Sequence, residues 1–128
     1  MNPEYLNTYF KIPQQRAGDL PSEFFIVTAF NPDGRDHAKE LNQSFDLDLA
    51  ALIQNKSLSS WRVIGGSHDF AHAESGYAIA ANLEVGIEMG IHFRQEAIFW
   101  INNGKLYLVD CSSRQQMPMG EWKLRVVV

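Results

Sequence analysis

The sequence contains one cysteine, Cys111, among its 128 residues. A single cysteine excludes an internal disulfide and a zinc site built from several thiolates. No apolar run approaches the ~20 residues that a membrane-spanning helix needs. The first ten residues, MNPEYLNTYF, lack the basic start and the apolar centre of a secretory signal. We therefore expect a cytoplasmic protein that does not bind membranes.

An excess of basic residues is also missing. The chain has 11 Lys and Arg against 15 Asp and Glu, which gives a formal net charge of −4. Domains that bind nucleic acids present a basic face to the phosphates, so we do not expect a nucleic-acid partner. The hydrophobic fraction of 45% and the charged fraction of 20% are those of a globular domain. We predict a single domain over residues 1–128.

Hydrophobic periodicity predicts the secondary-structure elements. A run of aromatic and β-branched residues, FFIVTAF, predicts a buried strand over 24–30 that ends before Pro32. Apolar residues at helical spacing predict a helix over 36–55, with Asp36 as its N-cap. The remaining expected elements are strands over 61–66 and 76–81, a hairpin formed by 97–101 and 105–111 around an Asn-Gly turn, and an edge strand within 121–128.

Residues 83–95 fit two patterns. Apolar residues occupy every odd position from Leu83 to Phe93, which is typical of a strand. The same residues also make i,i+4 pairs, and Gly86 and Gly90 have the spacing that lets a helix lie close on a sheet. We predict a helix, because the preceding strand needs a connection that returns the chain.

The expected order from residue 24 is β-α-β-β-α-β, followed by a hairpin. This order predicts an α+β fold with a ferredoxin-like split βαβ core and an added C-terminal β-hairpin or edge strand. In this arrangement residues 1–23 are a lead-in segment, residues 24–111 form the core, and residues 112–128 form a C-terminal extension.

This topology carries three polar segments to one end of the sheet: the turn after the first strand, the loop from His68 to Glu74, and the junction at Arg94. Polar side chains that converge on loops above a sheet are typical of a binding site. The predicted ligand-binding residues are Asn31, Asp33, Arg35, Glu74, Arg94 and Gln95. A structural role is the alternative, in which Asn31 caps the next turn and Gln95 binds loop carbonyls.

Three short motifs occur at these same places: TAFNP at 28–32, Glu74-Ser75, and FRQEAI at 93–98. They resemble a bacterial family of domains of unknown function, whose pattern is T-A-x-N-P, then Glu-Ser, then F-G-Q-x-A-I. The resemblance covers about residues 24–110. Arg94 stands where the family pattern has glycine, which raises the question of the backbone conformation there. The resemblance implies no established activity.

Metal and cofactor chemistry have little support. The segment HDFAHAE contains His68, His72 and Glu74, which are residue types that bind divalent cations. The segment lies in a predicted loop, however, where their spacing does not place them on one face. We expect no metal ion and no cofactor, with these three residues as weak metal candidates. Cys111, at the end of an apolar strand, is expected to be a buried and unreactive thiol.

Three functions are compatible with these observations. The first is recognition of a small polar ligand or a protein segment at the end of the sheet that carries Asn31, Glu74 and Gln95. The second is a small hydrolase or transferase in which Glu74 acts as an acid or base with His68 or His72. The third is a protein binder of the immunity or antitoxin type, in which aromatic residues either anchor an interface or fill the core: Trp61, Trp100, Tyr107 and Trp122. No catalytic residue is assigned.

Overall fold

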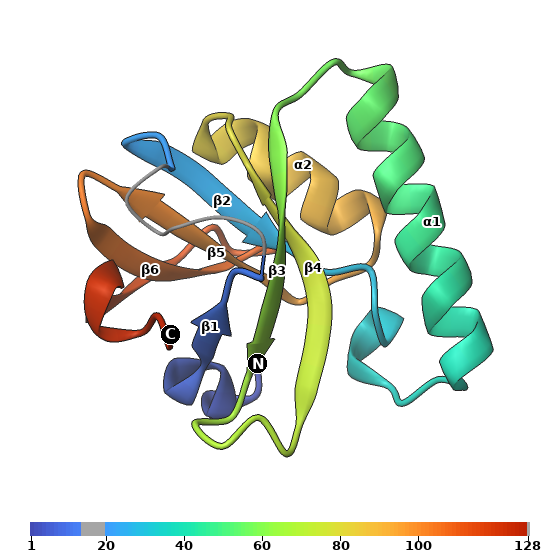
Figure 1. Ribbon diagram of the computed structural model, residues 1–128, viewed down its shortest axis with the longest axis horizontal. Helices are drawn as coiled ribbons and strands as arrows, with labels where there is room; N and C mark the ends of the chain where they lie inside the picture. The colour runs from blue at the N-terminus through green and yellow to red at the C-terminus, as the bar shows by residue number, and fades with distance from the viewer. Residues whose placement is uncertain (14–19, 128) are drawn as a thin grey trace.

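The computed structural model describes residues 1–13 and 20–127 (Figure 1). Within these ranges the chain forms two α-helices, α1 (Lys39–Asn55) and α2 (Leu83–His92). Its strands are β1 (Tyr9–Lys11), β2 (Glu23–Val27), β3 (Ser60–Gly66), β4 (Ala73–Ile79), β5 (Ala97–Asn102), β6 (Lys105–Asp110) and β7 (Gln116–Glu121). Short 3₁₀ turns are η1 (Pro3–Asn7), η3 (Pro32–Gly34) and η4 (Trp122–Leu124). None of the helices in this described part of the chain has the length and apolar character needed to cross a membrane.

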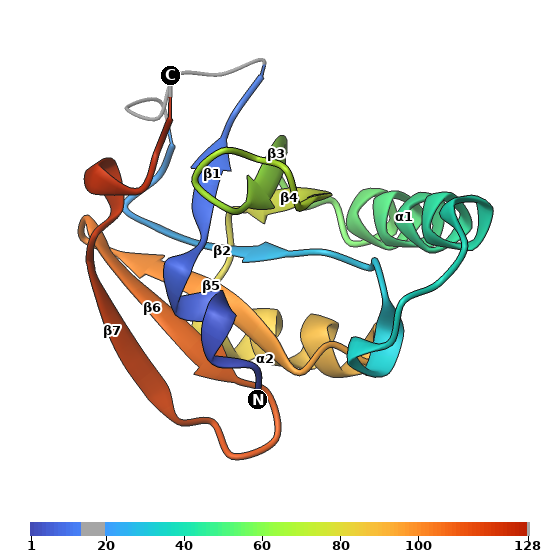
Figure 2. The ribbon, with the colours of Figure 1, turned by 90° about the horizontal axis from the view of Figure 1, so that it is seen from below.

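The strands form one antiparallel sheet in the order β1-β3-β4-β2-β5-β6-β7. This sheet is strongly curled, so that it makes half of a barrel, and α1 and α2 lie outside the curl (Figures 1 and 2). The chain after η4 returns to β1, where the Phe10 N–H donates to the Arg125 carbonyl over 2.8 Å. The predicted α+β class is confirmed, whereas the number of strands and the curl were not predicted.

Alternate residues of β2 enter two separate cores, as expected for a central strand. Phe25 and Val27 pack between the sheet and the helices, together with Leu49 and Ile53 of α1 and Ile87 of α2. Phe24 and Ile26 instead point into the hollow of the curled sheet. The buried residues that fill this hollow with them are Phe10, Val63, Ala78, Ile101, Leu106 and Trp122.

The ambiguous segment is a helix, as predicted, and it ends at His92 rather than at Gln95. Its two glycines face the sheet at very short distance. A Cβ atom on Gly86 would lie 2.8 Å from both the Phe25 and Ile98 side chains, and one on Gly90 would lie 2.7 Å from the Cys111 sulfur. The odd-numbered apolar residues therefore belong to a helix that lies close on the sheet, since only glycine permits this approach.

The predicted hairpin is also confirmed. Strands β5 and β6 pair in register, with Asn102 opposite Lys105. The two turn residues, Asn103 and Gly104, have φ angles of 49° and 80°. Positive φ at both central residues defines the turn type that fits the right-handed twist of a hairpin, and Asn-Gly is its preferred sequence.

One strand was not predicted, and two predicted strands have other bounds. β1 was not predicted at all, because its three residues are too few to show a periodicity. β2 ends at Val27 instead of Phe30, since the chain turns away from the sheet at Thr28. β4 begins at Ala73 instead of Gly76, so Glu74 lies on a strand rather than in a loop.

The other two corrections concern α1 and the C-terminus. The N-cap of α1 is Ala38, not Asp36, and no side chain of the cap residue bonds to the helix. The corner is held instead by Asn31, whose side-chain oxygen accepts from the His37 N–H. The last strand is β7, which precedes the predicted segment; Pro118 within it is tolerated because β7 is the outer strand next to β6.

Candidate functional site

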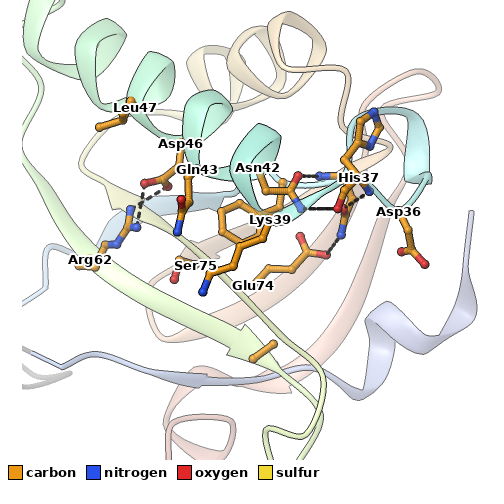
Figure 3. Close-up of a pocket in the computed structure, with 13 residues that line it drawn as sticks. Asp36, His37, Lys39, Asn42, Gln43, Asp46, Leu47, Arg62, Glu74 and Ser75 are labelled. Carbon is orange, nitrogen blue, oxygen red and sulfur yellow. Dashed lines mark hydrogen bonds and ion pairs between the residues drawn. The ribbon is translucent and has the colours of Figure 1, made fainter.

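A cavity of about 760 Å³ lies between the first half of α1 and the strands β3 and β4 (Figure 3). We call it the α1–β4 cavity. Its volume is in the range of small-molecule sites. The residues that line it are Phe30, Asn31, Asp36, His37, Lys39, Asn42, Gln43, Asp46, Leu47, Arg62, Ala73, Glu74 and Ser75.

The amides of Asn31 and Asn42, which both line this cavity, bind each other. The Asn31 backbone N–H donates to Asn42 Oδ1 over 2.8 Å, and Asn42 Nδ2 donates to Asn31 Oδ1 over 2.9 Å. Asn31 Oδ1 also accepts from the His37 N–H at 3.0 Å. Asn31 has a left-handed backbone with φ 50°, a conformation that asparagine tolerates better than most residues. Most of its hydrogen-bonding capacity therefore fixes the turn that leads into α1.

One group of Asn31 remains, and it is directed at Glu74. Asn31 Nδ2 donates to Glu74 Oε2 over 3.4 Å, which is long for a hydrogen bond (Figure 3). Glu74 is only partly exposed, and burial raises the pKa of its carboxyl group. The negative charge of Asp36 raises this pKa further, while hydrogen bonds from Asn31 and Thr28 lower it. The carboxylate is thus costly to ionise and weakly satisfied, which is typical of a functional group.

The position of Glu74 depends on the separation of β2 and β4. The Thr28 hydroxyl donates to the Ser75 carbonyl over 2.8 Å, at the point where the two strands diverge. A Cβ atom on Gly76 would lie only 2.4 Å from the Val27 carbonyl oxygen, so the two main chains cross there at glycine distance. Beyond this crossing, β4 follows β3 alone and carries Glu74 under α1.

Tyr5 of η1 interacts with the charges of Glu96 and Glu74. Burial raises the pKa of its hydroxyl group, and the charges of Glu96 and Glu74 raise it further. The N-terminal turn is therefore close enough to Glu74 to sense its charge, although the lead-in segment was not predicted to contribute to the site.

Gln95 and Arg94 bind the turn over residues 30–33 by hydrogen bonds. Gln95 Nε2 donates to the Phe30 and Phe93 carbonyls at 3.0 and 3.2 Å, so its amide nitrogen holds loop backbone, as in the structural alternative. The Asp33 N–H donates to the Arg94 carbonyl, and the two side chains form an exposed ion pair. Asn31, Glu74 and Gln95 thus converge on one end of the sheet, but Gln95 does not line the cavity.

The backbone at Arg94 has φ 56°, the left-handed conformation that glycine favours. Its N–H bonds to the Ile91 carbonyl, and the Gln95 N–H bonds to the Gly90 carbonyl over 2.8 Å. These two bonds form a Schellman motif at the C-terminus of α2, in which the left-handed residue is usually glycine. Arg94 therefore keeps the backbone that a glycine would adopt there.

We expect Arg94→Gly to be more stable than Arg94→Ala by about 1 kcal/mol, because only glycine removes the strain of the left-handed backbone. Both variants lose the exposed pair with Asp33, so its loss cancels in the comparison. Urea denaturation followed by tryptophan fluorescence measures the difference. Equal free energies of unfolding would show that the backbone at residue 94 is unstrained.

The histidines predicted for acid–base or metal chemistry lie elsewhere. His68 and His72 are exposed residues of the β3–β4 turn, and the His68 ring packs on Tyr9 at 4.5 Å. Neither lines the α1–β4 cavity, and neither does Arg35, which is exposed. Across residues 1–13 and 20–127, no group of three or more His, Cys, Asp or Glu residues is arranged to hold a metal ion.

Most polar residues of the cavity were not predicted to bind a ligand, among them His37, Asn42, Asp46 and Arg62. Arg62 donates two hydrogen bonds of 2.8 Å to Asp46 and lies over the Tyr77 ring. The His37 ring is held by a contact of 2.6 Å between Nδ1 and the Arg35 carbonyl. The sequence around Asn42 is mostly polar and gave no signal that its amide is buried, although a buried amide needs partners.

Cys111 is a buried thiol, 4% exposed, and burial followed by the Asp110 charge raises its pKa to about 11. The tryptophans mostly contribute to the core. Trp122 is buried in the hollow of the sheet. The Trp100 indole N–H donates to Glu23 over 3.1 Å. Trp61 packs beside the same hollow.

The sequence matches the family described as "Protein of unknown function (DUF3293)" over residues 27–98. The chain belongs to this family. Neither a curated protein nor a solved structure shows significant similarity to it. The DUF3293 region contains Asn31, Asn42 and Glu74, which line the cavity, and Gln95, which binds the Phe30 carbonyl.

Proposed function

We propose that this DUF3293 domain is a recognition module that binds a small polar ligand in the α1–β4 cavity, with Glu74 as the central hydrogen-bond acceptor. The observation that carries the proposal is the state of the Glu74 carboxylate. It is partly buried and faces the cavity, and the hydrogen bond that it accepts from Asn31 is long, at 3.4 Å (Figure 3). A ligand that donates to Glu74 replaces the water that burial has removed.

The surrounding residues support a role in binding rather than in folding alone. The Asn31–Asn42 pair and the Arg62–Asp46 pair hold the two sides of the cavity by hydrogen bonds of 2.8 and 2.9 Å. Because these side chains are already held by their partners, they lose little conformational entropy when a ligand binds beside them. The ferredoxin-like description of the central unit is part of this proposal; its support is the strand order β5-β2-β4-β3 with α1 and α2 packed into one core.

Acid–base catalysis is the second candidate. Burial raises the pKa of Glu74, and a raised carboxyl pKa lies closer to the neutral pH at which an acid–base catalyst works. The histidine that lines the same cavity is His37, whereas His68 and His72 do not line it. An enzyme of this kind would keep its affinity and lose turnover when Glu74 is replaced by glutamine. A binding module would lose affinity and show no turnover in either form.

Native mass spectrometry of the full chain, purified gently from its own cells, tests the proposed function. We expect a small-molecule adduct on the wild-type protein and its loss in Glu74→Gln. Glu88→Gln is the matched control, since Glu88 is an exposed residue of α2 outside the cavity. An adduct that survives equally in Glu74→Gln, or a wild-type protein that carries none, would contradict the proposal.

Glu74→Gln should also stabilise the fold at neutral pH. The folded-state pKa of Glu74 is raised, so its favourable contribution is complete below the unfolded pKa of about 4.3 and is lost as the pH rises through the folded value. Glutamine keeps an oxygen for Asn31 and carries no charge. We expect the variant to melt above wild type at pH 7 and close to it near pH 4. A gain of the same size at both pH values would show that the charge of Glu74 is not its cause.

A further inference from the structure

The charges that line the α1–β4 cavity do not cancel. Its carboxylates are Asp36, Asp46 and Glu74, and its cations are Lys39 and Arg62. Arg62 and Asp46 neutralise each other through two hydrogen bonds of 2.8 Å. The remaining lining charges are two carboxylates and one lysine.

That lysine does not neutralise Glu74. Lys39 is exposed at the start of α1, and the ion pairs formed among residues 1–13 and 20–127 do not include Glu74. The negative charge of Asp36 acts on Glu74 and raises its pKa. Tyr5 also interacts with Glu74, and its hydroxyl group is neutral below its own raised pKa. Among residues 1–13 and 20–127, Glu74 therefore faces the cavity without an ion-pair partner.

Apolar groups also line the cavity. Phe30 and Ala73 line the cavity next to Asn31 and Glu74 in the chain, and Leu47 lines it from α1. An aromatic ring and alkyl groups next to carboxylates fit a ligand that joins a cationic nitrogen to a hydrocarbon stem.

We propose that the ligand of the α1–β4 cavity is an alkyl amine, whose protonated nitrogen binds at Glu74 and Asp36 and whose hydrocarbon part packs on Phe30. This inference rests on the proposed function and names its ligand class. A metal cation does not fit as well, because three carboxylate or histidine ligands do not meet in the described residues. The same ammonium group can come from a free amine or from a lysine side chain in an extended segment.

Three probes of one size separate the charge of the ligand from its shape: n-butylamine, 1-butanol and butyrate. Each is titrated into the ¹⁵N-labelled full chain, and the amide shifts of Asn31, Ala73, Glu74 and Ser75 are followed. We expect saturable shifts with butylamine and binding at least about tenfold weaker with butanol, because a charge-assisted hydrogen bond is lost. Nα-acetyl-lysine methylamide is the fourth probe; tighter binding than butylamine identifies a lysine in a peptide as the source.

Two variants and the pH test the assignment. Glu74→Gln should weaken butylamine binding about tenfold, whereas Glu88→Gln on α2 should leave it unchanged. Butylamine stays protonated from pH 5 to about 8. A pH dependence of its affinity that is present in wild type and absent in Glu74→Gln is assigned to the Glu74 carboxyl, whose pKa burial raises. The other charged or ionisable side chains that line the cavity are Asp36, His37, Lys39, Asp46 and Arg62.

The outcomes distinguish the two proposals. Equal binding of butanol or butyrate to the same amides overturns the amine inference and leaves recognition of a polar ligand in place. No shift of these amides with any probe also overturns the amine inference, while the adduct experiment decides the proposed function separately. Butylamine binding that is unchanged in Glu74→Gln overturns the assignment of the ammonium to Glu74.

Discussion

Gly76→Ala is expected to destabilise the fold by about 2–3 kcal/mol, although it adds a single methyl group. The added Cβ would lie 2.4 Å from the Val27 carbonyl oxygen and 3.2 Å from the Thr28 Cα. These neighbours are main-chain atoms, which cannot move aside as a side chain can. β2 and β4 must therefore separate, and the displacement reaches Glu74 two residues earlier in β4. Urea denaturation followed by tryptophan fluorescence measures the loss.

Gly65→Ala is the matched control for this prediction. Gly65 lies on the adjacent strand β3, and a Cβ there would meet the Phe10 ring at 3.4 Å, an ordinary contact. Neither glycine has a positive φ angle, so the two substitutions differ in space rather than in backbone strain. We expect Gly65→Ala to change stability by less than about 1 kcal/mol. Similar losses in both variants would show that the crossing at Gly76 is not the cause.

Asn42→Ala is expected to cost about 2–3 kcal/mol. The Asn42 side chain is 8% exposed and accepts from the Asn31 N–H while it donates to Asn31 Oδ1. Alanine removes these bonds and leaves the Asn31 N–H without its acceptor in a partly buried turn. The higher helix propensity of alanine recovers only a few tenths of a kcal/mol. Chemical denaturation gives the free energy, and hydrogen exchange at the Asn31 amide gives the local effect.

Asn55→Ala makes the same change at the exposed end of α1. We expect it to be close to neutral in stability and to leave exchange at Asn31 unchanged. In Asn42→Ala, exchange at Asn31 should accelerate more than exchange in β2, because the turn opens locally before the sheet unfolds. Uniform acceleration along the chain would mean that Asn42 contributes to global stability without holding this turn.

The elements that could be predicted are those whose evidence lies within a short stretch of sequence. The Asn103-Gly104 sequence favours the positive φ angles that its turn adopts, and the i,i+4 apolar pairs of 83–92 predict a helix. Edge elements could not be predicted in the same way. β1 has three residues and is defined by its pairing with β3, while β7 contains a proline that is acceptable only at the outside of a sheet.

The candidate site was predictable in part. Chain direction placed Asn31, Glu74 and Gln95 at one end of the sheet, and the structure brings these three segments together there. The role of each amide could not be predicted. Gln95 Nε2 donates to the Phe30 carbonyl, and Asn31 Oδ1 accepts from Asn42 Nδ2. In each bond the two residues come from different segments, so they meet only in the folded chain.

The sequence by itself determined the α+β class, the two helices and the hairpin, because the spacing of apolar residues and the conformation of Asn-Gly are local properties of the chain. Only the tertiary structure decided the curl of the sheet, the early start of β4 and the burial of Glu74 beside Asp36. These features depend on residues that are far apart in the sequence, such as Gly76 and Val27, whose main chains approach each other closely, and Asp36, whose charge acts on Glu74. Such distances are set by packing, and no local pattern encodes them.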